Sequence, residues 1–360
     1  MPSIIDYLYW RGDLSLRDFP FNDVDNLILS QLAYVQPECA GLAFGCWTLK
    51  DMAPALIPCA EAFGTMSLDE TRRMLELMAA GARFSDAVVC RYAHSFDEEC
   101  EKQFAAMTVQ LDDGVTYVAF RGTDNTMVGW KEDFNMAYLP VVPAQMDALA
   151  YLLAEAAEHA GPLRVGGHSK GGNLAVYAAS CAPEDVQDRI LAVYSNDGPG
   201  MSDESFQSPG YRRVVPKVRS IIPDFSIVGM LLHEHEVYTV VKSCVTGLMQ
   251  HDPFTWQTAR DGFVTAESLS PLSARLDETL DTWMAEVPPK EREELVDCLF
   301  SVFGDTKQGF YSEMRRHMPR RALEMLFALR RASPETRRRM RQLAFSLAGA
   351  FRGPDGDEKK

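Results

Sequence analysis

The chain lacks an excess of basic residues, a close cysteine pair and a long apolar run. Its 36 Lys and Arg stand against 51 Asp and Glu, and the formal net charge of -15 argues against general nucleic-acid binding. Its eight cysteines are scattered, without a C-x-x-C pair or a histidine at zinc-site spacing, so we expect reduced thiols and no metal. No stretch is long and apolar enough to span a bilayer, and the first residues carry no secretory signal. We therefore expect a cytoplasmic protein that works without a cofactor.

One pentapeptide carries the strongest signal for chemistry. Residues 167–171 read Gly-His-Ser-Lys-Gly, and they follow a short apolar strand predicted at 163–166 and precede a helix rich in small residues. A G-x-S-x-G pattern between a strand and a helix is typical of the turn on which α/β-hydrolases expose a nucleophilic serine. Ser169 is therefore the candidate nucleophile. The alternative is an ordinary glycine-rich turn in which Ser169 is a local hydrogen-bonding residue.

The order of predicted elements indicates an α/β fold. A chain of 360 residues with 46% hydrophobic content can bury a large core. Strands are predicted at 105–111, 116–120, 163–166, 190–195, 218–222 and 237–241, with helices between most of them. This alternation predicts the α/β-hydrolase fold, with a largely parallel central sheet covered by helices.

Four regions are predicted along the chain. Residues 1–103 form an N-terminal mixed layer, with helices over 22–32 and 67–80; Ser67 begins a capping-box pattern at the second. Residues 104–260 form the catalytic core, 261–350 a helical C-terminal region, and 351–360 a disordered polar tail.

A serine nucleophile needs a general base, for which the sequence offers several histidines. His251 lies in a loop-like segment after the last predicted strand, where a base can reach over the edge of the sheet, and it is the preferred candidate. His233 and His235 alternate along the start of a strand and are expected to be structural, although either could supply the base. His317 lies among arginines on a helix and is expected to be solvated. His168, beside the nucleophile, is expected to pack or to support the site.

The acid that orients the base follows the serine in the chain order of α/β-hydrolases. Asp224 follows the strand predicted at 218–222 and is the preferred candidate. Asp197 ends the preceding strand and is the competitor, although its Asp-Gly sequence also fits a plain turn.

An oxyanion intermediate needs hydrogen-bond donors held ready for it. The main-chain N–H of Lys170 is the first candidate. Thr123, in the Arg-Gly-Thr loop after the strand at 116–120, supplies a second N–H and a hydroxyl. The alternative for Thr123 is a simple turn stabilised by its hydroxyl.

These motifs resemble those of two known protein families. Residues 117–123 (Tyr-Val-Ala-Phe-Arg-Gly-Thr), Trp130, Asp133 and the pentapeptide resemble the class 3, fungal-type lipases, which implies an oxyanion role for Thr123 and a lid over 125–130. The apolar residues Met127, Val128 and Trp130 would then gate the acyl-binding site. Over its whole length the chain is more similar to the bacterial Mbeg1-like (DUF2974) family, which is assigned to the α/β-hydrolase fold but implies no substrate.

These patterns favour a serine hydrolase that cleaves small-molecule acyl esters through Ser169, His251 and Asp224. A thioesterase or lysophospholipase with the same residues is a close alternative, and a non-catalytic binding or scaffold protein is the alternative from another class. The sequence leaves oligomeric state open. Arginines gather late in the chain, where they form a solvated helix face or a weak contact with an anionic surface. They are Arg315, Arg316, Arg320, Arg321, Arg330, Arg331, Arg337, Arg338, Arg339 and Arg341.

Overall fold

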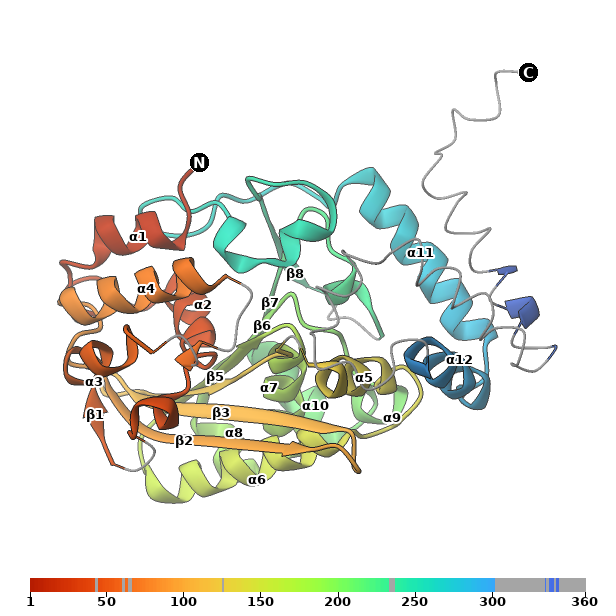
Figure 1. The fold of residues 1–360 in the computed structure, drawn as a ribbon, viewed down its shortest axis with the longest axis horizontal. Helices are drawn as coiled ribbons and strands as arrows, with labels where there is room; N and C mark the ends of the chain where they lie inside the picture. Colours follow the sequence, from red (N-terminus) through yellow and green to blue (C-terminus); the bar gives the residue numbers. More distant parts are fainter. Residues whose placement is uncertain are drawn as a thin grey trace.

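A computed structural model of the chain describes residues 1–42, 45–59, 62–63, 67–124, 126–232, 237–301, 334, 337–339 and 341–342. Figure 1 shows a central twisted sheet with helices on both faces and a helical segment at the end of the molecule opposite the N-terminal helices. In the described part of the chain no helix is both long and apolar enough to cross a membrane.

One mixed sheet organises the fold. In the described part of the chain it has eight strands in sequential order, β1 to β8. Strands β1 to β4 pair antiparallel, and β4 to β8 pair parallel. The strands are β1 Trp47–Thr48, β2 Val88–Asp97, β3 Lys102–Gln110, β4 Thr116–Phe120, β5 Leu163–His168, β6 Ile190–Asn196, β7 Val218–Pro223 and β8 Tyr238–Val241. The helix-covered sheet confirms the predicted α/β-hydrolase class.

The sequential order of the parallel strands decides where the helices lie. Crossovers between parallel strands are right-handed, so strands added in one direction place all their connecting helices on the same face. That face is covered by helices whose apolar residues form one cluster with Val118, Phe120, Val165 and Val193 of the sheet. The helices between β4 and β7 are α5 Met127–Asn135, α6 Pro143–Glu158, α7 Lys170–Cys181, α8 Glu184–Arg189, α9 Asp203–Phe206 and α10 Pro209–Val214.

The N-terminal layer covers the other face. Its helices are α1 Ile4–Arg11, α2 Asp23–Leu32, α3 Leu49–Leu56 and α4 Leu68–Ala80. Leu27 and Ile28 of α2 are fully buried in a cluster that also contains Tyr117 and Tyr194 of the sheet. Without this layer the apolar side chains that the crossovers leave bare would face water. The layer is therefore part of one core with the sheet.

Two details of the N-terminal region differ from expectation. Strands β1 and β2 extend the central sheet, and the expected boundary at residue 103 falls inside β3. Ser67 precedes α4 as expected but makes no side-chain cap. Its backbone, with φ -96° and ψ 63°, lies outside the extended region that a capping residue usually adopts. Its hydroxyl donates a hydrogen bond of 2.7 Å to Asp252 Oδ2. This contact joins α4 to the segment that carries His251.

The C-terminal region begins with two helices, α11 Pro271–Glu286 and α12 Pro289–Ser301. Leu276 of α11 packs against Phe225 after β7, and Val296 and Phe300 of α12 pack against α5. Short 3-10 helices occur at Pro37–Ala40, Val215–Lys217, Val228–Met230, Gly247–His251 and Pro253–Thr255. The expected tail at 351–360 and most of 302–350 lie outside the described residues.

Candidate active site

Ser169 lies on a strained turn between β5 and α7. Its backbone has φ 57° and ψ -133°, a conformation that is costly for a residue with a side chain and that is typical of a nucleophile elbow. The flanking glycines make the turn sterically possible. A Cβ at Gly167 would lie 2.3 Å from the backbone of Gly171, and a Cβ at Gly171 would lie 2.1 Å from the carbonyl oxygen of Phe120. The close backbone approach enforces the strained turn, which places Ser169 at the carboxyl end of the sheet.

Three side chains meet at this turn in a linear arrangement. His251 Nε2 lies 3.0 Å from Ser169 Oγ. On the other side of the ring, His251 Nδ1 lies 2.6 Å from Asp197 Oδ2. A carboxylate can only accept, so Nδ1 donates to Asp197 and Nε2 is left to accept the hydroxyl proton of Ser169. This is the tautomer that a general base beside a serine requires.

The acid in contact with His251 is Asp197, and Asp224 is not within hydrogen-bond distance of it. Strand β6 neighbours β5, with His168 paired to Asn196, so the residue after β6 lies directly beside Ser169. Strand β7 is one position further out, and Asp224 bonds through its N–H to Val241. Asp224 Oδ1 is buried and has no hydrogen-bond partner among the described residues. The expectation that Asp224 orients His251 is corrected accordingly.

A second set of donors holds Asp197 in place. Its backbone is in the left-handed region, with φ 49°, and its side chain is almost fully buried. Oδ1 accepts a 2.5 Å hydrogen bond from Ser226 Oγ and a 3.2 Å bond from the N–H of Gly229. A carboxylate bound by donors on both oxygens has little freedom to rotate. Oδ2 therefore stays directed at His251.

Ser226 is itself fixed by the C-terminal region. Its N–H donates to Ser273 Oγ over 3.1 Å, and Ser273 Oγ donates to the carbonyl of Ser226 over 2.7 Å. Ser273 lies in the first turn of α11 and is fully buried. A reciprocal pair of this kind fixes both position and orientation. Helix α11 is thus connected to His251 through Ser226 and Asp197.

The electrostatic surroundings favour a charged His251 ring. Burial opposes the imidazolium, but the hydrogen bond and negative charge of Asp197 outweigh it and raise the pKa of His251 above its usual value. Asp133 and Asp252 act in the same direction. A ring that gains a proton readily is suited to take one from Ser169.

His168 supports the base from the nucleophile's own strand. Its Nε2 lies 2.9 Å from the carbonyl oxygen of His251, and its Nδ1 lies 3.4 Å from the hydroxyl of Tyr34. Burial, and next the neighbouring His251, hold the pKa of His168 well below its usual value, so the ring is neutral. A neutral ring that donates from Nε2 to a carbonyl accepts at Nδ1. The expected supporting role of His168 agrees with these contacts.

The proposed oxyanion donors lie beside Ser169. The loop that carries Thr123 abuts the turn, because a Cβ at Gly122 would lie 3.1 Å from Ser169 Cβ. As the first residue of α7, Lys170 has an N–H without an intrahelical partner. Thr123 donates its hydroxyl to Asp133 Oδ2 over 2.6 Å, and its N–H has no acceptor among the described residues. The N–H groups of Thr123 and Lys170 remain the candidates for the oxyanion hole.

The residues expected to gate the site lie in the first turn of α5. The structure describes this helix from Met127, and Asn125 lies outside the described residues. Met127 and Trp130 pack against Val296 and Phe300 of α12, and Val128 is half-buried. Helix α12 therefore covers Met127 and Trp130 of α5.

Other candidates fall outside the described part of the chain. His233, His235 and His317 cannot be placed, and neither can most of the late arginines. Arg339 is described, and it lies 3.7 Å from Glu286 and 3.5 Å from Glu291. Within the described ranges, no group of three His, Cys, Asp or Glu residues could hold a metal ion.

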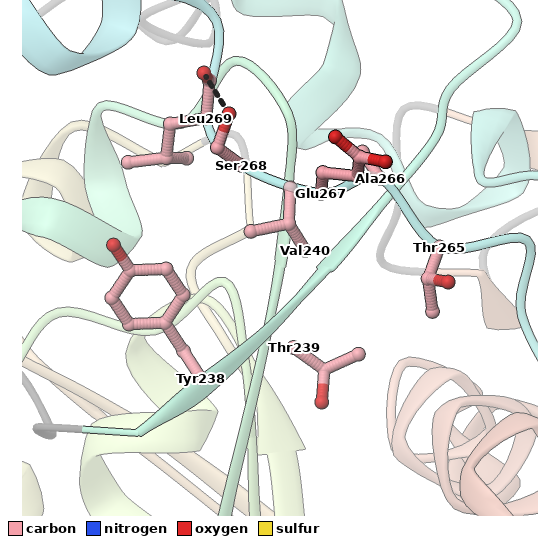
Figure 2. Close-up of a pocket in the computed structure, with 8 residues that line it drawn as sticks. All are labelled: Tyr238, Thr239, Val240, Thr265, Ala266, Glu267, Ser268 and Leu269. Carbon is pink, nitrogen blue, oxygen red and sulfur yellow. Dashed lines mark hydrogen bonds between the residues drawn. The ribbon is translucent and has the colours of Figure 1, made fainter.

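A pocket of about 370 Å³ lies away from this site, against the edge strand β8. Figure 2 shows side chains from β8 and from the segment that runs beside it. Its lining contains none of the residues that contact Ser169. It is lined by Tyr238, Thr239, Val240, Thr265, Ala266, Glu267, Ser268 and Leu269.

The sequence analysis did not identify three residues that support the site: Tyr34, Ser226 and Ser273. It named a fourth, Asp133, only as part of the lipase-like motif. All four act on the central residues through hydrogen bonds or charge. No local pattern marks them, because each reaches the site from a separate segment of the chain. Only the fold brings them together.

The strand order, the strained serine turn and the covering helices define a protein of the α/β-hydrolase class. Within that class the chain belongs to the Mbeg1-like family, which matches residues 78–301. No curated protein sequence matches the chain at a significant level.

Two solved lipase structures are similar in outline. The Rhizomucor miehei lipase propeptide complex is 16% identical with a TM-score of 0.37, over 72% of this chain and 81% of that chain. M37 lipase is 15% identical with a TM-score of 0.36, over 59% of this chain and 69% of that chain. Similarities of this size do not bear on the substrate.

Proposed function

We propose that the protein is a serine hydrolase that cleaves carboxylic esters at Ser169. The observation that carries the proposal is the pair of contacts made by His251, 3.0 Å to Ser169 Oγ and 2.6 Å to Asp197 Oδ2. A serine hydroxyl is a poor nucleophile at neutral pH, and it becomes effective when an oriented base takes its proton. The strained turn, which has a cost in stability, is a second reason to infer chemistry at this serine.

The geometry supports a two-stage reaction. Ser169 Oγ attacks the ester carbonyl carbon while its proton passes to His251 Nε2, and the carbonyl oxygen becomes an oxyanion. The N–H groups of Thr123 and Lys170 stabilise that oxyanion. The C–O bond to the alcohol then breaks, and His251 returns the proton to the departing oxygen. Water, activated by His251, hydrolyses the acyl-serine and releases the acid. A thioester would follow the same steps with sulfur as the leaving atom.

The test compares the protein with two serine variants. Ser169→Ala removes the proposed nucleophile, and Ser268→Ala changes an exposed serine away from the site. We expect the unaltered protein and Ser268→Ala to release p-nitrophenol from p-nitrophenyl esters of graded chain length and to react with a fluorophosphonate probe. Ser169→Ala should do neither. Equal background release in all three proteins, without labelling, would leave a non-catalytic binding protein as the better interpretation.

A further inference from the structure

The side chain of Lys170, directly after the proposed nucleophile, runs into the interior of the protein. Its Nζ lies 2.7 Å from Glu132 Oε2, 2.8 Å from the carbonyl oxygen of Gln103 and 3.1 Å from Gln103 Oε1. The side chains of Lys170 and Glu132 are both fully buried. A buried ammonium is tolerated only when it is paired and hydrogen-bonded in this way. Glu132 belongs to α5, and the lipase resemblance places a lid over 125–130, which includes the first residues of this helix.

Glu132 joins α5 to three other elements. Besides Lys170 of α7, its Oε2 accepts a 3.0 Å bond from the N–H of Gln103 in β3, and its Oε1 accepts a 2.9 Å bond from the N–H of Ala144 in α6. Both carboxylate oxygens are therefore occupied, and every donor comes from the rigid body of the fold. Movement of α5 away from the site would break all of these bonds together.

Further contacts fix the rest of the helix. Lys131 and Asn135 bind the two carboxylate oxygens of Glu101, at 2.5 Å and 2.7 Å. Gly129 allows a very close approach, because a Cβ there would lie 2.8 Å from Gln103 Oε1 and 2.9 Å from Thr123 Cγ2. The helix is thus packed directly against the loop that holds the proposed oxyanion donor.

Opening of α5 would carry a large penalty. It would leave the Lys170 ammonium and its partners without their bonds in a buried position, and breaking a buried pair in this way reduces the population of the broken state by more than about a hundredfold. The outer face of α5 is also covered, because Met127 and Trp130 pack on α12. A helix that opens at a lipid surface needs the opposite arrangement, with weak contacts beneath it and a free apolar face.

We propose that α5 is a fixed wall of the active site and that the substrate is an ester dissolved as single molecules, not one presented in a lipid aggregate. The substrate class rests on the proposed hydrolase function, whereas the fixed position of α5 does not. A wall that stays in place at an interface makes no new opening there, so we expect aggregation of the substrate to give no gain in rate.

The first experiment follows hydrolysis of tributyrin by the full chain as its concentration passes the solubility limit, with Ser169→Ala as the blank. We expect a rate that saturates below the limit and does not rise beyond it. A rise of several-fold at the limit would overturn the proposal. Absence of Ser169-dependent hydrolysis at every concentration, with p-nitrophenyl butyrate as well, would instead overturn the hydrolase function and with it the substrate class.

The second experiment tests whether α5 stays in place, and it does not depend on enzymatic activity. Hydrogen exchange of the α5 amides is measured with and without micelles of a short-chain phosphatidylcholine. We expect equal protection in both conditions, and loss of protection with micelles would show that α5 opens. Glu132→Gln removes the charge that pairs with Lys170 and should speed exchange in α5, whereas the matched control Glu99→Gln, at an exposed position, should not. If Glu132→Gln does not fold, hydrogen exchange of the unaltered protein with and without micelles still shows whether α5 opens.

Discussion

His168 donates a hydrogen bond of 2.9 Å from its Nε2 to the main-chain oxygen of His251. The residue before the proposed nucleophile therefore holds the backbone of the proposed base, and the two rings lie with centroids 4.7 Å apart. The base reaches the site on a 3-10 helix after β8, distant from Ser169 in sequence. A contact between these two segments fixes the Ser169 to His251 distance more directly than packing alone.

The first prediction concerns this contact. His168→Phe keeps a ring of similar size but removes the donor, so the carbonyl of His251 loses its partner and the base loses orientation. We expect kcat to fall about tenfold with little change in KM, in line with the loss of one buried hydrogen bond. Tyr34→Phe removes the bond from Tyr34 to Nδ1 of His168, and also the hydroxyl's contact with the backbone of Gly122, and it should have a smaller effect. Steady-state kinetics on a p-nitrophenyl ester checks both, and an effect on KM alone would contradict a positioning role.

The second prediction separates the two candidate acids. Asp197→Asn replaces the acceptor of the His251 Nδ1 proton with an amide that can favour the wrong tautomer, so kcat should fall by about 10³- to 10⁴-fold. Asp224→Asn should keep kcat within about threefold, because Asp224 does not contact the base. Circular dichroism and thermal melting show whether each variant folds. A larger loss for Asp224→Asn than for Asp197→Asn would reverse the assignment made from the contacts.

The difference between these two acids shows what the sequence could reveal. Ser169 is marked by glycines whose spacing the turn requires, and His251 by its place after the last strand. Chain order places the acid after the serine but does not say which strand end lies beside it. Asp197 is followed by glycine and resembles a plain turn, and only the register of His168 with Asn196 puts it next to Ser169.

The residues that support the site could not be predicted from the sequence for a related reason. The strands and the helices between them follow from local periodicity, and their alternation predicts the fold class. The pairing of Lys170 with Glu132 could not, because a lysine after the serine carries no sign of whether it points to solvent or inward. Long-range polar contacts depend on the final packing of segments, and single-sequence patterns do not encode them.

The third prediction tests the connection from α11 to the acid. Ser226→Ala removes the 2.5 Å bond to Asp197 Oδ1, and we expect kcat to fall about tenfold while KM stays nearly constant. Ser273→Ala removes the pair that fixes Ser226, and it should lower kcat less. Ser268→Ala, at an exposed position shortly before Ser273 in the sequence, serves as the control for both. Reduced thermal stability with unchanged kcat in both variants would mean that α11 stabilises the fold without orienting Asp197.

The last prediction concerns pH. His251 must be neutral to act as a base, so kcat/KM should rise as pH increases through the pKa of His251, which lies above its usual value. Asp133 contributes to that raised pKa, and burial raises the pKa of Asp133 itself to about 6, so Asp133 is charged above that pH. Asp133→Asn removes the negative charge and keeps an oxygen for the Thr123 hydroxyl. Loss of a nearby anion destabilises the imidazolium, so the acid limb of the profile should move to lower pH. The control Asp86→Asn, at an exposed position, should leave the acid limb of the pH profile unchanged. If the acid limb of Asp133→Asn stays in place or moves to higher pH, Asp133 does not act on His251 through its charge.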